Sequence, residues 1–331
     1  MLIFRYQIPK LRIKPLVKTV ITTSPDEAAQ FIKRGGIVAF GTETVYGIGA
    51  SVFDERAVAK IFEAKQRPAD NPLIAHISDL DQLSELVIEV TPNAEKFIDA
   101  FFPGPLTIVL KKLQRVPDNA TAGLDTIGVR MPKLRSANDF LRACEVPVVA
   151  PSANISGRPS PTTWEAVLED LDGRIDCVLR GAPTSIGLES TVVDCTAEFP
   201  VLLRSGSVTL EQLKSVVPET TGTPRSDSIR PRSPGMKHKH YSPRAKVVLV
   251  SGVAELTAIN GSDAAFIGIS AISELFRFTK AFNTVDEYAR EVFEFFRECD
   301  RAGIGTIYCQ TVPETGIGAA LMDRLRRAEK G

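Results

Sequence analysis

Four cations stand beside hydroxyl-rich segments that are far apart in this sequence: Lys65, Arg67, Arg130 and Arg204. A guanidinium group can bind a phosphate or a carboxylate through two parallel hydrogen bonds, and a lysine ammonium acts as a point charge. Together the four predict a binding site for an anionic ligand. Each cation taken alone is more typical of a solvated surface charge, so the prediction depends on the fold bringing them together.

The hydroxyl-rich segments follow apolar runs that are typical of buried strands. Residues 37–40 run into a polar loop, and residues 148–150 run into the loop PSANISG at residues 151–157. Because ligands of α/β sheets bind beyond the carboxyl ends of strands, we expect both loops to face a ligand. The first loop can equally be an ordinary polar turn in which Gly47 and Gly49 give backbone freedom.

Further elements are needed to place the other candidates. Strands are predicted at residues 73–77, 106–110, 177–179, 191–194 and 201–204, and helices at residues 24–33, 57–65, 92–102 and 162–171, the last with a capping box of Thr162 and Glu165. These strands place Ser190 and Arg204 at strand ends. His76 falls in the outgoing half of a strand, where a satisfied core histidine is the alternative.

Familiar catalytic signatures are absent from the sequence. It contains no G-x-x-x-x-G-K-[ST], no G-x-G-x-x-G after the first strand, no G-x-S-x-G and no H-E-x-x-H. These absences exclude a P-loop enzyme and remove the commonest serine hydrolases and zinc proteases. The near match GIGAA at residues 316–320 is more typical of close helix packing.

Composition narrows the class of protein. The 331 residues include 40 basic and 40 acidic side chains, so a formal net charge of zero gives no global attraction to nucleic acid or membranes. No secretory signal and no run of 18 apolar residues is found. Five widely spaced cysteines without a C-x-x-C pair predict reduced core residues. We therefore expect a soluble, cytoplasmic protein of about two domains.

The chain changes character after its first 200 residues. Residues 215–244 contain five prolines and many basic residues but almost no apolar periodicity, which predicts a linker or a functional segment. His240 lies in this segment, where a solvated side chain is the alternative. Beyond it, strands are predicted at residues 246–250, 264–269 and 306–309, with a helix capped by Thr284 and a basic helix at residues 319–330.

A set of short motifs occurs in a recognisable order: TETVYG (42–47), KQRP (65–68), NPL (71–73), PSAN (151–154), LEST (188–191), RSG (204–206) and SPGM (233–236). With them the chain resembles the YrdC-like family of threonylcarbamoyl-AMP synthases in its longer, two-domain form. The resemblance implies an α/β fold: a YrdC-like twisted mixed sheet with an open cleft at residues 15–206, a lid-forming linker at 207–244 and a smaller Rossmann-like α/β domain at 245–331.

The same resemblance implies a reaction. L-threonine, bicarbonate and ATP would give L-threonylcarbamoyladenylate and pyrophosphate, for the modification of adenosine 37 in tRNA. Mg²⁺ would be held through the ATP phosphates and not by protein side chains. The product would pass to a downstream threonylcarbamoyl transferase, with weak tRNA contact and no membrane. A YrdC-like domain has also been regarded as a binder of double-stranded RNA, an alternative against which the zero net charge weighs.

Carried over position by position, the resemblance implies roles for individual residues. Lys65, Arg67 and Arg204 would be catalytic. The threonine-binding positions are Thr44, His76, Arg130, the backbone of Ala150, and Ser190. The nucleotide-binding positions are Lys65, Arg67, Asn71, Thr126, Ser152, Asn154, Ser160, Arg204 and Tyr241. Tyr241 would make the linker a lid that excludes water. Gly41 departs from the family, which more often has proline there.

Overall fold

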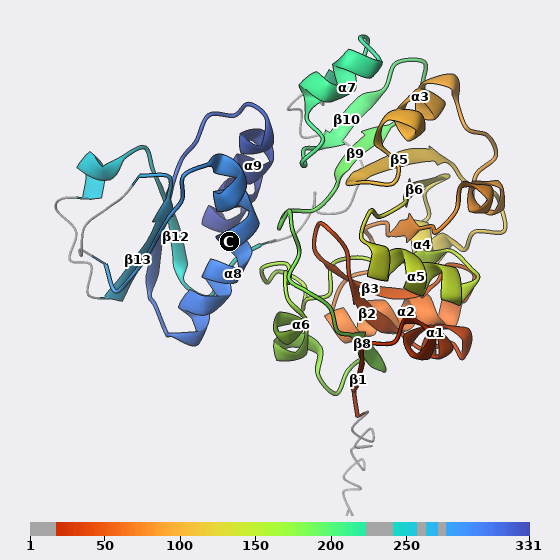
Figure 1. The fold of residues 1–331 in the computed structure, drawn as a ribbon, viewed down its shortest axis with the longest axis horizontal. Helices are drawn as coiled ribbons and strands as arrows, with labels where there is room; N and C mark the ends of the chain where they lie inside the picture. Colours follow the sequence, from red (N-terminus) through yellow and green to blue (C-terminus); the bar gives the residue numbers. More distant parts are fainter. Residues whose placement is uncertain (1–17, 223–240, 257–262, 271–275) are drawn as a thin grey trace, which may run out of the picture.

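The computed structural model describes residues 18–222, 241–256, 263–270 and 276–331. These residues form a large and a small α/β unit that lie side by side (Figure 1). The large unit contains a mixed sheet and the small unit a parallel one, which confirms the predicted fold class.

The large sheet has the strand order β1-β8-β2-β3-β7-β4-β6-β5-β9-β10-β11. Its strands are β1 (Val20–Thr22), β2 (Val38–Gly41), β3 (Tyr46–Ser51), β4 (Ile74–His76), β5 (Leu106–Lys111), β6 (Thr126–Arg130), β7 (Val148–Val149), β8 (Cys177–Leu179), β9 (Thr191–Asp194), β10 (Val201–Arg204) and β11 (Thr221–Gly222). Its helices are α1 (Pro25–Lys33), α2 (Glu55–Lys65), α3 (Pro92–Phe101), α4 (Asp118–Thr121), α5 (Arg135–Cys144), α6 (Trp164–Leu171) and α7 (Leu210–Val216), with the short 3-10 helix η1 (Leu80–Glu85).

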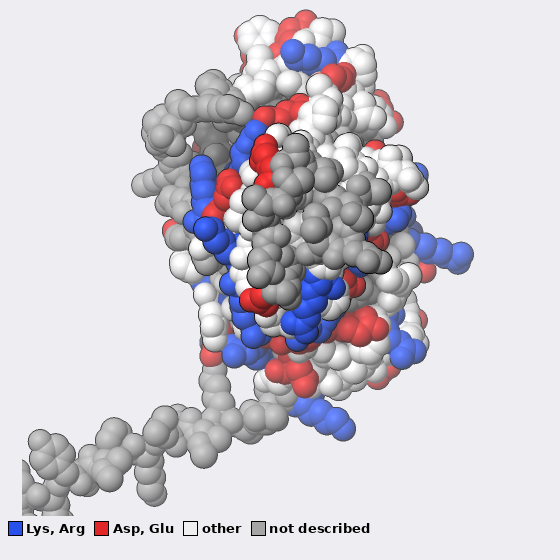
Figure 2. All heavy atoms as spheres, turned by 90° about the vertical axis from the view of Figure 1, so that its left-hand side faces the viewer, with Lys and Arg blue, Asp and Glu red and all other residues white. Residues whose placement is uncertain are grey.

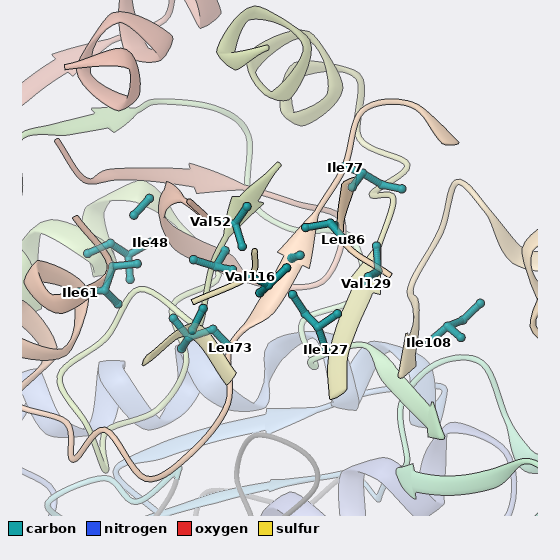
Figure 3. Close-up of a cluster of buried hydrophobic side chains, with 14 of the residues drawn as sticks. Ile48, Val52, Ile61, Leu73, Ile77, Leu86, Ile108, Val116, Ile127 and Val129 are labelled. Atoms are coloured by element: carbon teal, nitrogen blue, oxygen red, sulfur yellow. The ribbon is translucent and has the colours of Figure 1, made fainter. Parts of the chain in front are cut away.

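Alternation along β2 explains how this sheet is covered on both faces. Val38 and Phe40 pack into a cluster with residues of α1 and α5, whereas Ala39 belongs to a larger cluster that includes Ile61 of α2. Figure 3 shows part of the larger cluster, in which Ile48 and Ile61 lie close together. Because successive side chains of a strand point to opposite faces, an unbroken apolar run is what a strand buried on both faces requires.

The polar loop that was predicted after residue 40 is in part a strand, which is a correction to that prediction. A short turn leads into β3, which pairs antiparallel with β2. A Cβ on Gly49 would lie 2.5 Å from Cγ1 of Val148, so this glycine permits close packing of β3 against its neighbours. A Cβ on Gly41 would lie 3.0 Å from the ring of Tyr46, its partner in the β2–β3 pair.

The start of the predicted linker also differs from the structure. Val208, Leu213 and Val217 are buried in the core of the large unit, and α7 contacts α3, so these residues belong to that unit. The interval between residues 223 and 240, which contains His240 and the SPGM motif, is outside the described residues. Likewise, Thr163 and not Thr162 caps α6, by accepting a hydrogen bond from the Ala166 amide.

The small unit is a four-stranded parallel sheet among the described residues, in the order β12-β15-β13-β14. Its elements are β12 (Lys246–Val250), the 3-10 helix η2 (Val253–Leu256), β13 (Ala264–Gly268), β14 (Phe278–Ala281), α8 (Val285–Arg301), β15 (Thr306–Gln310) and α9 (Ile317–Glu329). The helices α8 and α9 pack on one face of the sheet and lie between it and the large unit (Figure 1). Strand β14 was not predicted, because it is short and mostly exposed and so has no apolar run.

Candidate active site

A cavity of about 690 Å³, partly open to solvent, lies where several strands of the large sheet end. It is lined by Thr42, Thr44, Val45, Gly47, Arg67, Ile74, His76, Arg130, Ala150, Pro151, Ser152, Asn154, Arg158, Ser160, Glu189, Ser190, Arg204 and Tyr241. All predicted site residues except Lys65, Asn71 and Thr126 are in this lining. His76, Arg130 and Arg204 are the last residues of β4, β6 and β10, so three strand ends position them.

Arg130 is held by a network at one end of the cavity. Its Nη1 donates to Thr44 Oγ1 at 2.7 Å, its Nη2 to Glu43 Oε1 at 2.6 Å and its Nε to the Gly104 carbonyl at 3.1 Å. Burial would raise the pKa of Glu43, but the charge and hydrogen bond of Arg130 outweigh burial and hold it below its usual value. Arg130 and Glu43 therefore form a buried ion pair that fixes Thr44.

His76 is a neutral imidazole in this environment. It is 5% exposed, and its Nδ1 lies 3.1 Å from the Ile74 carbonyl oxygen. The Phe40 ring meets its ring edge-on, with centroids 5.8 Å apart. Burial, assisted by the positive charge of Arg130, lowers the pKa of His76 to about 3. The side chain thus offers the cavity a hydrogen-bonding group without a charge.

Arg204 and Arg67 supply positive charge to the other part of the cavity. Arg204 donates from Nε to the Ser190 carbonyl at 2.9 Å and from Nη2 to Ser190 Oγ at 3.0 Å. Arg67 donates from Nη2 to the Asn71 carbonyl at 3.1 Å. Burial lowers the pKa of each guanidinium to about 10, so both remain cationic near neutral pH.

The loop after β7 contributes the next wall through Ser152 and Asn154. Ser152 Oγ donates to Asn154 Oδ1 at 2.6 Å, and Asn154 Nδ2 donates to two backbone carbonyls. Lys65 does not line the cavity. Its buried Nζ donates to the carbonyls of Ser152 and Asn154, and burial lowers the pKa of Lys65 well below its usual value. Lys65 therefore stabilises the backbone of this loop and does not face the cavity.

Two other predicted residues also lie away from the cavity lining. Asn71 contributes its carbonyl to Arg67. Thr126 is the first residue of β6, whose last residue is Arg130, and four residues of strand span about 13 Å. Thr126 lines a separate, small cavity together with Thr107 and Gly128.

Tyr241 closes the cavity at the boundary between the two units. It is 6% exposed, has a φ of +65°, and stacks on Phe293 of α8 with ring centroids 5.3 Å apart. The Ser242 amide that follows donates to the Gly157 carbonyl. Burial, with the negative charge of Glu189, raises the pKa of Tyr241 to about 12, so its phenol is neutral.

Comparison with known proteins assigns both units. Residues 30–206 match the family model named Sua5, YciO and YrdC, described as telomere recombination. Residues 208–329 match the model described as the threonylcarbamoyl-AMP synthase C-terminal domain.

The chain belongs to the threonylcarbamoyl-AMP synthase family.

Relatives named threonylcarbamoyl-AMP synthase match nearly the whole chain. The one from Pyrococcus abyssi is 45% identical over 315 residues, covering 91% of this chain and 92% of the relative. The one from Bacillus subtilis is 39% identical over 320 residues, covering 92% of each. A crystal structure of P. abyssi Sua5 complexed with L-threonine has a TM-score of 0.87 at 42% identity, and covers 95% of this chain and 97% of that one.

Membership of the threonylcarbamoyl-AMP synthase family makes this chain a transferase of tRNA modification and favours that function over RNA binding as such. On the face of the molecule in Figure 2, where the small unit lies in front, Lys and Arg are interspersed with Asp and Glu among the described residues. Within the described segments, no helix is long and apolar enough to cross a membrane.

Two carboxylates of the site, Glu43 and Glu189, are not among the predicted site residues. Both lie inside recognised motifs, TETVYG and LEST, from which only the neighbouring hydroxyl residues were chosen. Their signal was present, because an acidic residue between buried hydroxyl positions needs a cationic partner. Which partner each one takes is a property of the fold.

Proposed function

We propose that this cavity joins L-threonine, bicarbonate and ATP into L-threonylcarbamoyladenylate, and releases pyrophosphate. The observation that carries the proposal is that Thr44, His76 and Ser190 share one cavity with Arg67 and Arg204 in a chain of this family. The P. abyssi relative, which was crystallised with L-threonine, supports threonine as the amino-acid substrate.

Threonine would bind at the end of the cavity that contains Arg130. A guanidinium has five N–H groups, and the three hydrogen bonds described for Arg130 use three of them. Two remain for the carboxylate of the amino acid. The neutral imidazole of His76 and the hydroxyl of Thr44 suit its polar groups without adding charge.

The chemistry needs alignment and charge neutralisation more than a strong base. The threonine ammonium first loses a proton to solvent. The neutral amine nitrogen then forms a bond to the bicarbonate carbon, and water leaves to give a carbamate. A carbamate oxygen then bonds to the α-phosphorus of ATP while the bond to the bridging oxygen breaks, so pyrophosphate carries away the electron pair. Arg67 and Arg204 would neutralise the charge that develops on the phosphates, which fits the lack of a catalytic triad.

Mg²⁺ would enter with ATP. No group of three or more potential metal-ligating side chains occurs among the described residues, and Glu43 and Glu189 each pair with an arginine. These side chains fit a Mg²⁺ ion whose ligands would be oxygens of the triphosphate. When bound, the ion would neutralise phosphate charge.

We further propose a cytoplasmic enzyme that hands its adenylate to a downstream threonylcarbamoyl transferase, with weak tRNA contact. All five cysteines are free and buried, which supports a reducing compartment.

Omission of single substrates tests the proposal. Pyrophosphate release should need threonine, bicarbonate and ATP together, and Arg67→Ala should abolish it while leaving the circular dichroism spectrum unchanged. Full release without threonine would refute the proposed reaction, and unaltered turnover of Arg67→Ala would refute the role of that residue.

A further inference from the structure

Arg324 belongs to the small unit but reaches the wall of the cavity in the large one. It lies on α9 and is 1% exposed. Its Nε donates to Glu189 Oε2 at 3.1 Å, and its Nη1 to the Ser205 carbonyl at 2.8 Å. Its guanidinium carbon lies 5.7 Å from the centre of the Tyr241 ring. One side chain therefore touches three segments that form or adjoin the cavity.

Glu189 is the cavity residue through which Arg324 can act. The second oxygen of its carboxylate accepts a hydrogen bond from Ser160 Oγ, and both residues line the cavity. Burial would raise the pKa of Glu189, but the charges of Arg324 and Arg204, with the Ser160 hydrogen bond, hold it below its usual value. Glu189 is therefore an ionised carboxylate inside a site proposed to bind anions.

The ion pair between Arg324 and Glu189 also affects the electrostatic environment of Arg204. This residue donates to neutral oxygens of Ser190, while Arg324 takes the direct ion pair with Glu189. If Arg324 were neutral, the buried carboxylate would lack its hydrogen-bonded counter-ion. It would then attract the Arg204 guanidinium and repel a polyphosphate.

We propose that Arg324 is a positioning residue for the nucleotide part of the cavity: it fixes and neutralises Glu189, so that the charge of Arg204 remains available to the triphosphate. The small unit thereby supplies a side chain on which the active site depends. This inference rests on the proposed function, because it assigns a triphosphate to the cavity.

The test uses the full-length chain with Arg324→Gln, Arg324→Lys, Glu189→Gln and the double variant Arg324→Gln/Glu189→Gln. Arg324→Gln should raise the KM for ATP about ten-fold or more, while threonine affinity changes less than about two-fold. Arg324→Lys keeps the charge and should show a smaller defect. The control is Arg301→Gln, which removes an exposed ion pair between the units, to Glu169, and should leave both constants unchanged.

Two measurements distinguish an effect of Arg324 on the charge of Glu189 from a role of Arg324 that is limited to holding the two units together. Burial raises the pKa of Glu189 and Arg324 opposes that effect, so the pKa of Glu189 should be higher in Arg324→Gln than in the wild type, and protonation of Glu189 at low pH should shrink the ATP defect. The double variant should have a KM near that of Glu189→Gln, because the unpaired charge is gone.

The inference is overturned if Arg324→Gln keeps the wild-type KM for ATP, or if adding Glu189→Gln leaves the ATP defect of Arg324→Gln unchanged. If Arg324→Gln does not fold, the comparison of Glu189→Gln with the double variant decides, and a double variant that is ten-fold worse would overturn the inference. A wild-type chain that forms no adduct refutes the proposed function instead.

Discussion

At the scale of single residues, the two arginines of the cavity that end strands have different partners. Arg130 is paired with the buried carboxylate of Glu43, whereas Arg204 donates to the neutral oxygens of Ser190. The charge of Arg130 is therefore neutralised by Glu43, and Arg130 acts as a positioned hydrogen-bond donor. The charge of Arg204 can interact with a ligand. This difference fits a zwitterionic amino acid near Arg130 and a polyphosphate near Arg204.

Replacing Glu43 tests the compensated pair. Glu43→Gln leaves the Arg130 charge buried without a counter-ion, which should cost about 3–5 kcal/mol in the free energy of unfolding and weaken threonine binding. Urea unfolding and calorimetric titration with threonine measure the two effects. The control is Glu145→Gln, an exposed partner of Lys33, which should change stability by less than about 0.5 kcal/mol. Equal effects of the two substitutions would contradict the assignment.

The pKa of Glu43 adds a pH signature. Because the folded-state value is depressed below 4.5, this carboxylate stabilises the fold above that pH, and the contribution is lost as pH falls through the folded-state value. Glu43→Gln should therefore remove part of the acid sensitivity seen in the wild type below about pH 4.5.

The pKa of His76 gives a second pH prediction. The unfolded chain protonates His76 near its usual value of 6.5, whereas the folded chain does so only at about 3. Stability should therefore fall as pH is lowered between these values, because the unfolded state binds the extra proton. NMR titration should show a His76 ring whose chemical shifts stay constant down to about pH 4, and His76→Gln should be less acid-sensitive. A ring that titrates near 6.5 would contradict the buried, neutral state.

At the scale of elements, strand β3 can pack closely against its neighbours only because position 49 is a glycine. Gly49 should not accept a side chain, because its Cβ would lie 2.5 Å from Val148 Cγ1. Gly49→Ala should destabilise the fold by about 1–3 kcal/mol in urea unfolding. Gly252→Ala is the control, since a Cβ there meets nothing within 4 Å. Combination with Val148→Ala should recover part of the loss, and strictly additive losses would argue against the contact.

The elements also show how far the sequence could predict the fold. Strands β9 and β10 were predicted with the bounds that the structure shows, because each short apolar run ends at a charged residue and follows a residue that limits the strand, Thr191 in β9 and Pro200 before β10. Strand β3 was missed, because its two glycines are typical of turns and uncommon in strands. The start of the linker was misplaced, because α7 buries few residues and its burial depends on packing against α3.

The candidate site also has a part that the sequence predicts and a part that only the fold determines. Motifs predicted most of the residues that line the cavity, since each motif is local. The pairing of Glu189 with Arg324 could not be predicted, because 135 residues separate the two and no local pattern encodes their contact. Lys65 shows the same limit: its type suggested phosphate binding, whereas the fold directs its Nζ to backbone carbonyls.

At the scale of the whole molecule, the small unit is joined to the cavity by buried contacts. Arg297 of α8 donates to the buried Asp170 and to the Pro159 carbonyl, and Tyr241 stacks on Phe293. These contacts hold the segment that begins with Tyr241 against the large unit. The geometry therefore predicts that the second unit acts by completing the wall of the active site.

Shortening Tyr241 tests this arrangement. Tyr241→Ala should open the cavity to water, so that a larger fraction of the adenylate is hydrolysed to AMP. Tyr241→Phe keeps the stacking and should behave more like the wild type. The ratio of AMP to adduct, measured by chromatography, reports the leakage. The same ratio in Tyr241→Ala and wild type would show that Tyr241 does not exclude water.

The central claim is that one cavity joins three substrates, and product labelling tests it most directly. The wild-type chain should be incubated with ATP, Mg²⁺, L-threonine and ¹³C-bicarbonate, and the nucleotide products analysed by mass spectrometry. The account predicts an AMP adduct that contains threonine and the ¹³C label, formed in equal amount with pyrophosphate. Pyrophosphate release without such an adduct, or an adduct that lacks the label, would contradict it.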